Sequence, residues 1–372
     1  MSIYDELGVK RYINALATVT MFGGSLMPGE VLDAMREAAG SFVSIPELQK
    51  KAGDYIAKLT HNEAAMISNG AAAGMVLATA ACIAGDDPDK RNALPYTDDM
   101  KNEIVLFEGK RVGYDFAIRQ AGGKIVGYGG AEGTTANQLE AAITKNTAAI
   151  FIFQFEHQMD AQPSIEAQVA IGKRHGVPVI VDAAAQIPKK ENLWRFTRDL
   201  GADAAIFSGG KGLRGPQSSG LVVGRRALIE RMASFACPNG GIGRPLKVGK
   251  EEIVGLMAAV KRYMERDEAA DLRTYEEWVR AAVDAFAGDQ AVLVERDYPS
   301  EAGQPMPRAK LTPRPGALKI NARGIDAALR ACEPGVLVTS TDGSIFINPQ
   351  TLNPGEIEIV IEKIQRVIEA NR

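Results

Sequence analysis

Six short apolar runs recur through the middle of this 372-residue chain, and helical stretches separate them. Segments such as TTANQLEAAITKN and SIEAQVAIGKRHG have the apolar spacing of amphipathic helices. Because strands that are apolar throughout are buried on both faces, this alternation predicts an α/β fold with a mostly parallel sheet and helices on both faces. Ligands are expected at the carboxyl ends of its strands. The runs are Glu103–Phe107, Lys124–Tyr128, Ala149–Phe153, Pro178–Asp182, Asp203–Phe207 and Gly220–Gly224.

The pattern changes in the last third of the chain. A long amphipathic helix leads to the runs GALKI, VLVTST and SIFINP and to a final helix, which together predict a smaller α+β domain. The length of the chain also suits a large domain plus a smaller one. We expect an N-terminal arm over residues 1–20, a large cofactor-binding domain over residues 21–248, and a linking helix with the small domain over residues 249–372.

Composition argues against several classes of partner. Charged residues make up 24% of the chain and the net charge is −3, which gives no general attraction to nucleic acid. Three widely spaced cysteines suggest neither a disulfide framework nor a metal cluster. The N-terminal residues do not have the pattern of a signal peptide, and no run of about 18 apolar residues occurs. We expect a cytoplasmic protein without a bound metal and without membrane or nucleic-acid partners.

The segment IFSGGKGLRGPQSSG presents Lys211 between glycines, directly after an apolar strand. A partly desolvated lysine loses its proton more readily, and its amine can then form a Schiff base with an aldehyde such as pyridoxal 5′-phosphate (PLP). The alternative is a surface lysine in a flexible loop. Ser208, three residues earlier, could bind the phosphate of the cofactor or serve as an ordinary turn residue.

Two upstream stretches suit the same cofactor. PVIVDAAAQ ends its strand at Asp182, where a carboxylate could pair with a protonated pyridine nitrogen or only cap a helix. In ISNGAAAG a turn of small residues opens a helix, and the free backbone N–H groups and helix dipole there favour a phosphate. The residues of this turn are Asn69, Gly70, Ala71 and Ala72.

The order and spacing of this turn, the aspartate and the lysine loop resemble those of fold-type I PLP-dependent enzymes. YINALATVTMFGGSLMP, IPELQKKAGDYIAKLT, SNGAAAG, GYDFAIRQAGGKIV, IVDAAA and FSGGKGLRGPQSSG resemble the selenocysteine synthase-like branch, which contains L-seryl-tRNA(Sec) selenium transferases and D-glucosaminate-6-phosphate ammonia-lyases. The resemblance covers most of the chain. It implies a seven-stranded sheet, PLP attached to Lys211, Asp182 at the pyridine nitrogen, and a homodimer or a larger assembly of dimers.

Motifs shared with this branch also contain candidate substrate-binding residues. Arginine forks match carboxylate and phosphate groups well, although each cation could equally belong to a solvated surface. The strand SIFINP lacks the arginine with which typical fold-type I aminotransferases hold a substrate carboxylate, and this argues against a transaminase. The candidates are Arg111, Tyr114, His157, Arg214, Arg244 and Lys247.

These residues suggest a reaction on a small amino substrate. Once the substrate displaces it from the cofactor, Lys211 could remove the Cα proton while Asp182 keeps the ring protonated. Loss of a β-hydroxyl would then give a 2-oxo acid and ammonia, whereas reprotonation on the other face would give racemisation. We favour a PLP-dependent lyase that eliminates from a hydroxylated amino acid or amino sugar acid, with an amino acid racemase or epimerase as the alternative.

Two further functions are less expected. Bacterial selenium transferases carry an additional N-terminal tRNA-binding region, whereas the motifs of this chain begin within its first thirty residues. A protein that binds PLP without catalysis would not need both Lys211 and Asp182.

Overall fold

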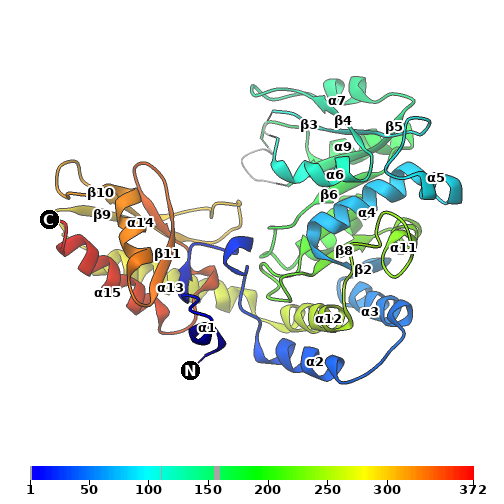
Figure 1. Ribbon diagram of the computed structural model, residues 1–372. Helices are drawn as coiled ribbons and strands as arrows, with labels where there is room; N and C mark the ends of the chain where they lie inside the picture. The colour runs from blue at the N-terminus through cyan, green and yellow to red at the C-terminus, as the bar shows by residue number, and fades with distance from the viewer. Residues whose placement is uncertain (1, 110, 155–159) are drawn as a thin grey trace. The chain divides into compact units, whose positions relative to one another are not determined.

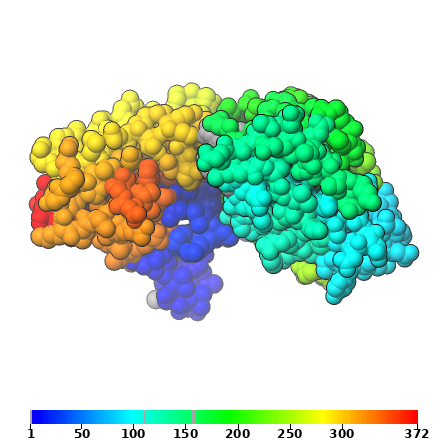
Figure 2. Space-filling view, turned by 90° about the horizontal axis from the view of Figure 1, so that it is seen from above, coloured from blue at the N-terminus to red at the C-terminus, as the bar shows by residue number. Residues whose placement is uncertain are grey.

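The computed structural model describes residues 2–109, 111–154 and 160–372 (Figure 1). They form two units, each with its own sheet and core. The larger unit is Ser25–Arg266, and the smaller unit combines Met1–Gly24 with Asp267–Arg372. Figure 2 shows one face of the larger unit, on which the cyan and green residues from the middle of the chain form a continuous surface.

The larger unit is built on a seven-stranded sheet with the order β2-β8-β7-β6-β5-β3-β4. β8 runs antiparallel to both of its neighbours, and the pairs from β7 across to β4 are parallel. This confirms the expected mostly parallel sheet. The strands are β2 (Ala64–Ser68), β3 (Glu103–Phe107), β4 (Lys124–Tyr128), β5 (Thr147–Phe153), β6 (Val179–Asp182), β7 (Ala204–Ser208) and β8 (Gly220–Gly224).

Helices cover both faces of this sheet, as the apolar strands predict. Along β5, Ile150 and Ile152 pack into the core on one face, and Phe151 packs into the core on the other. The first core is completed by α3 (Ile45–Leu59), α9 (Ile165–His175) and α12 (Lys250–Glu265), and the second by α4 (Gly70–Ala84), α6 (Phe116–Gln120) and α11 (Arg226–Phe235). The other helices of the unit are α2 (Gly29–Ala39), α5 (Pro88–Ala93), η2 (Gly113–Asp115), α7 (Ala136–Ala142), α10 (Asn192–Trp194) and η3 (Arg195–Asp199).

Helix α4 packs directly against the sheet, and its sequence is rich in alanine and glycine. A Cβ atom added at Gly74 would lie 3.0 Å from the Ile206 side chain and 3.1 Å from that of Val222. Close packing of this kind requires small side chains. It fixes the first turn of α4 at the edge of the sheet where β2 ends.

The smaller unit has a five-stranded sheet with the order β1-β11-β12-β10-β9. Apolar side chains of α13, α14 and α15 bury against it, which gives the expected α+β arrangement. The strands are β1 (Tyr12–Ala15), β9 (Val292–Asp297), β10 (Arg308–Pro313), β11 (Gly335–Ser340) and β12 (Ile345–Ile347). The helices are α1 (Ile3–Glu6), η1 (Thr20–Phe22), α13 (Glu268–Ala285), α14 (Ala322–Ala331), η4 (Pro349–Thr351) and α15 (Glu356–Glu369).

Both boundaries of the two units differ from those expected from the sequence. The N-terminal residues are no separate arm, because β1 pairs in parallel with β11 and buries Ile13 and Ala15 in the smaller core. The helix expected to link the domains, α12, belongs to the larger unit, where it packs against α2 and α3 (Figure 1). Its residues Ile253 and Leu256 are fully buried there. Local sequence does not predict β1, because it has only four residues. It also does not show which unit an amphipathic helix such as α12 packs against.

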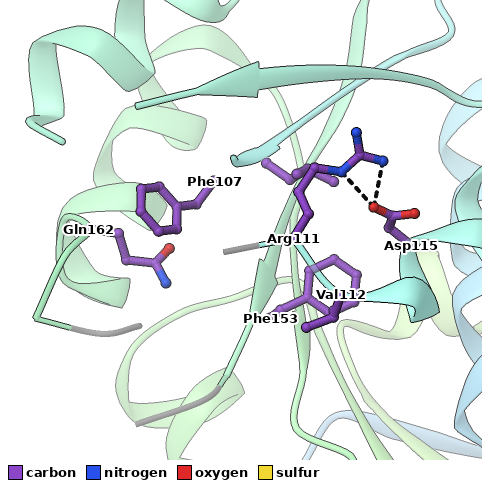
Figure 3. A pocket seen from close by; sticks show the side chains of 7 residues that line it. Phe107, Arg111, Val112, Asp115, Phe153 and Gln162 are labelled. Carbon is purple, nitrogen blue, oxygen red and sulfur yellow. Dashed lines mark hydrogen bonds and ion pairs between the residues drawn. The ribbon is translucent and has the colours of Figure 1, made fainter. Parts of the chain in front are cut away.

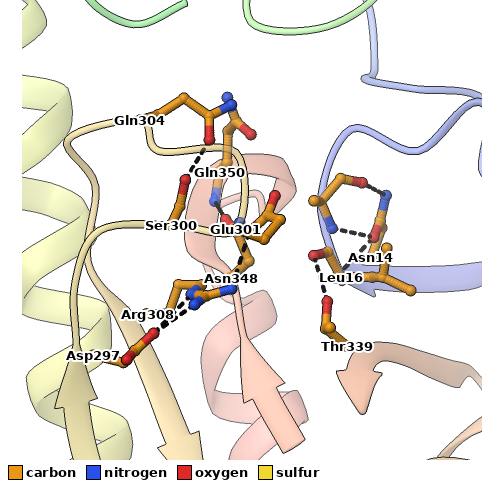
Figure 4. A network of polar contacts seen from close by, with 11 residues as sticks. Asn14, Leu16, Asp297, Ser300, Glu301, Gln304, Arg308, Thr339, Asn348 and Gln350 are labelled. Atoms are coloured by element: carbon orange, nitrogen blue, oxygen red, sulfur yellow. Dashed lines mark hydrogen bonds and ion pairs between the residues drawn. The ribbon is translucent and has the colours of Figure 1, made fainter. Parts of the chain in front are cut away.

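A polar network follows β12 in the smaller unit, at the strand that lacks the aminotransferase arginine (Figure 4). Asn348 is 1% exposed, and its side chain donates to Glu301 Oε2 at 2.9 Å. Arg308 pairs with Asp297 at 2.6 Å and with Glu301 at 3.3 Å. The guanidinium of Arg308 is thus held by two carboxylates of its own unit. In the described part of the chain, no helix is long and apolar enough to span a membrane.

Candidate active site

Asp182 and Ser208 end neighbouring parallel strands at one edge of the larger sheet. In the strand register Asp182 lies between Phe153 of β5 and Ile206 of β7. Ser208 ends β7 and pairs with Gly220, which in turn pairs with Ser68 directly before the turn at α4. The topology therefore brings the aspartate, the serine and the turn of small residues to the same edge of the sheet.

Asp182 is a buried carboxylate, with 5% of its surface exposed. Its Oδ1 accepts a hydrogen bond from Ala184 N at 3.1 Å. Burial raises the pKa of Asp182 to about 6, while the Ala184 N–H and the charge of Lys211 act in the opposite direction. A buried carboxylate of this kind suits a cationic partner, and a protonated pyridine nitrogen is one.

The lysine loop, residues 209–219, is folded back on itself by main-chain hydrogen bonds. Gly209 N donates to Ser219 O and Gly215 N donates to Gly209 O, each at 2.8 Å. Lys211 is half-buried, and its carbonyl oxygen accepts from Arg214 N at 2.9 Å. The loop therefore presents Lys211 from a bonded turn, in contrast to the flexible surface loop considered as the alternative.

The turn before α4 has the features of an anion cradle. Asn69 occupies the N-cap position without a side-chain capping hydrogen bond, and Gly70 has a φ of +76°. A Cβ at Gly220 would lie 2.4 Å from the carbonyl carbon of Gly70, so the close approach requires glycine at position 220, and the left-handed φ favours glycine at position 70. With Ala71 and Ala72 next in the helix, backbone N–H groups are offered to a phosphate with little side-chain obstruction.

Gln154 is a residue of this edge that the sequence analysis did not select. It follows β5, and its backbone N–H donates to Asp182 O at 2.9 Å. Its Oε1 atom is buried and has no hydrogen-bond partner within the described segments, and such an atom is costly to leave unpaired. Its position as a polar residue directly after a buried strand could have identified it from the sequence. The buried carboxylate, the cradle and this orphaned oxygen together fit PLP.

Arg111 lies beside the same edge of the sheet, in the small hollow shown in Figure 3. Its Nε and Nη2 donate to Asp115 Oδ2 at 2.7 and 2.6 Å, and Asp115 is buried. Phe153, which pairs with Asp182 across the sheet, also lines this hollow. Asp115 thus holds Arg111 beside Phe153 of β5, the strand next to the one that ends in Asp182. The sequence analysis did not select Asp115.

The other candidate substrate residues lie in different settings. Tyr114 is 61% exposed, next to Asp115. Arg214 Nε donates to Leu26 O at 2.9 Å, so part of this guanidinium is used by the backbone. Arg244 and Lys247 are exposed on the segment between α11 and α12, and Arg244 Nη1 lies 3.8 Å from Cys237 Sγ. His157 lies outside the described residues.

Comparison with known proteins gives the same cofactor. The family model for L-seryl-tRNA selenium transferase matches residues 20–276. The chain is 32% identical to D-glucosaminate-6-phosphate ammonia lyase of Salmonella typhimurium, over 99% of this chain and 98% of that protein. It is 34% identical to 5′-C-glycyluridine monooxygenase-decarboxylase of a Streptomyces species, over 98% and 92% of the two chains.

A solved structure of D-glucosaminate-6-phosphate ammonia-lyase superposes with a TM-score of 0.87 at 31% identity, and it covers 100% of this chain and 99% of that one. These findings confirm the fold-type I architecture, PLP as the cofactor and an enzyme of the PLP-dependent lyase class. The chain therefore belongs to the L-seryl-tRNA selenium transferase family of PLP-dependent enzymes.

Proposed function

We propose that this protein is an ammonia-lyase that eliminates water from a hydroxylated amino acid or amino sugar acid and releases a 2-oxo acid and ammonia. The observation that carries the proposal is the full-length similarity to D-glucosaminate-6-phosphate ammonia lyase. Because the similarity extends over both units, it includes the whole catalytic edge of the larger sheet and not the cofactor motifs alone. Amino sugar acids that carry a phosphate are the first substrates to test.

The residues at this edge of the sheet have separate roles in binding the cofactor and in moving the Cα proton. When bound, PLP supplies a conjugated ring that accepts the electron pair left at the substrate Cα. Lys211 holds the cofactor and then takes the Cα proton. Asp182 pairs with the pyridine nitrogen and keeps it protonated. Ser208 and the turn Asn69–Gly70–Ala71–Ala72 hold the phosphate of the cofactor through a hydroxyl and backbone N–H groups.

Cationic residues around this edge favour an acidic substrate. We assign Arg111 to an anionic group of the substrate, because Asp115 fixes its guanidinium beside the strand that neighbours Asp182. The Arg111 donors that do not face Asp115 can bind a carboxylate or phosphate. Tyr114, His157, Arg214, Arg244 and Lys247 remain candidates for the rest of the substrate.

The protein is also proposed to act as a cytoplasmic homodimer, or as a larger assembly of dimers. Several large apolar side chains of the larger unit are exposed in the single chain, among them Phe42, Tyr96 and Phe116. Light scattering at working concentration should give at least twice the 39.8 kDa mass of one chain. A fully active monomer would contradict this assignment.

The reaction can be tested with D- and L-hydroxyamino acids and phosphorylated amino sugar acids in deuterated water, followed by NMR. A keto product with one equivalent of ammonia is expected. Exchange and inversion at Cα without a keto product would identify a racemase instead. Because a relative of similar identity is named a monooxygenase-decarboxylase, dioxygen uptake and carbon dioxide release should be followed in parallel. Oxygen-dependent decarboxylation without elimination would refute the lyase.

A further inference from the structure

Ser25 and Leu26 form hydrogen bonds with the lysine loop, and they are the first two residues of the larger unit. The Ser25 hydroxyl lies 2.9 Å from both Gly210 O and Lys211 O, so its one hydrogen can be donated to either of the carbonyl groups that flank the Lys211 Cα, or shared between them. Arg214 Nε donates to Leu26 O at 2.9 Å. Two residues of the entering segment therefore contact the loop before and after Lys211.

The far side of the loop is already fixed by close backbone packing. A Cβ at Gly210 would lie 2.5 Å from Gln217 Cα, and a Cβ at Gly212 would lie 2.5 Å from Ile187 O. Neither position leaves room for a side chain. The contacts of Ser25 act on the carbonyl oxygens of Gly210 and Lys211, and they thereby restrain the backbone that carries the lysine side chain.

Arg214 contacts both the Lys211 backbone and the entering segment at Leu26. Its φ of +57° is a left-handed conformation that an arginine rarely adopts without compensation. In this conformation its backbone N–H reaches Lys211 O at 2.9 Å while its side chain reaches Leu26 O. Lys211 O thus accepts from both Arg214 N and the Ser25 hydroxyl, which gives one carbonyl two donors.

We propose that Ser25 is a positioning residue for Lys211. Its hydroxyl holds the Gly210–Lys211 peptide and so narrows the range of directions in which the Lys211 amine can approach PLP and the substrate Cα. Holding a reacting group in place raises its rate without any contact to the reacting atoms. The inference rests on the proposed function in one respect, since it takes Lys211 as the residue that carries the cofactor.

The test measures how fast protein freed of PLP attaches added PLP covalently, by stopped-flow absorbance and in the absence of substrate. Ser25→Ala should attach PLP about fivefold more slowly, the factor that one hydrogen bond represents. Ser25→Thr keeps a hydroxyl and should recover most of the rate. Ser234→Ala is the matched control, because its hydroxyl also donates to a main-chain carbonyl, that of Arg231 at 2.7 Å, on α11. It should attach PLP at the wild-type rate.

Hydrogen exchange provides a second measurement on the same PLP-free proteins. The amide hydrogens of Arg214 and Gly215 should exchange faster in Ser25→Ala, since they donate to Lys211 O and Gly209 O within the loop. If Ser25→Ala does not fold, Arg214→Gly is the substitute, because glycine accepts the left-handed φ while the contact to Leu26 is lost. It too should attach PLP more slowly.

Wild-type attachment and exchange rates in Ser25→Ala would overturn the proposal, as would a lower melting temperature with an unchanged attachment rate. A wild-type rate in Arg214→Gly, where that variant replaces Ser25→Ala, would do the same. Lys211→Ala separates this result from the proposed function. If Lys211→Ala still attaches PLP in a form that borohydride reduces, the role of Lys211 itself is wrong.

Discussion

At the scale of single residues, Asp182 is suited to its proposed role at a cost in stability. Burial raises its pKa to about 6 from the ordinary value of 3.8. The protonated carboxyl therefore favours folding at low pH, and this contribution is lost as the pH rises through about 6. At about 1.4 kcal/mol for each pH unit, the difference between about 6 and 3.8 corresponds to about 3 kcal/mol.

Asp182→Asn should consequently stabilise the PLP-free protein at pH 8 by up to about 3 kcal/mol, and the gain should shrink toward pH 4. Urea unfolding at both pH values measures it. With PLP bound, the same variant should lose turnover by about a hundredfold or more, because the pyridine nitrogen loses its anionic partner. Near-normal turnover with PLP fully bound would refute the role of Asp182, and an unchanged stability at pH 8 would refute the effect of burial.

Asp115 is expected to act through Arg111. Removing its charge in Asp115→Asn should raise KM for an acidic substrate about tenfold, as expected for the loss of charged hydrogen bonds, and should change kcat less. Asp326→Asn is a matched control, because Asp326 pairs with Arg330 at 2.8 Å over the same spacing of four residues. Equal KM values for the Asp115 variant and the wild-type protein would show that Asp115 does not act on substrate binding through Arg111.

At the scale of secondary-structure elements, the turn before α4 depends on the start of β8. The Cβ of Gly220→Ala would lie 2.4 Å from the carbonyl carbon of Gly70 and 2.6 Å from Ser68 Oγ. Overpacking of this kind costs about 1–3 kcal/mol. We expect weaker PLP binding in an absorbance titration, because the turn at Gly70 must move away from Gly220 to make room for the added Cβ.

Gly29→Ala is the control for this substitution, since a Cβ there meets no atom within 4 Å. It should bind PLP as the wild-type protein does. Unchanged PLP affinity in a folded Gly220→Ala variant would exclude the turn as the phosphate site.

The same scale separates what the sequence could predict from what it could not. β3, β4 and β8 match their apolar runs residue for residue. β3 and β8 are buried along nearly their whole length and need no polar alternation, whereas β4 is the edge strand and buries only Tyr128. The contact between Ser25 and Gly210 joins positions 185 residues apart, and no local pattern encodes it. β1 has four residues and is defined by its pairing with β11, which lies still farther away in the sequence.

At the scale of the whole molecule, the proposed cofactor residues all belong to the larger unit, while the smaller unit has its own core. The two tryptophans report on these units separately, because Trp194 packs against a core of the larger unit and Trp278 against that of the smaller one. A ligand that binds only the folded state stabilises it by about 2.7 kcal/mol at a concentration of 100 Kd. This stabilisation should act mainly on the unit that holds PLP.

The prediction uses Trp278→Phe and Trp194→Phe, each of which leaves one tryptophan as the reporter. In urea unfolding followed by fluorescence, saturating PLP should move the midpoint reported by Trp194 to higher urea. The midpoint reported by Trp278 should move less, because the apolar core around it contains no proposed cofactor residue. Lys211→Ala is the control, since without covalent attachment the shift at Trp194 should largely disappear. Equal shifts at both tryptophans would instead show that the two units unfold as one cooperative body.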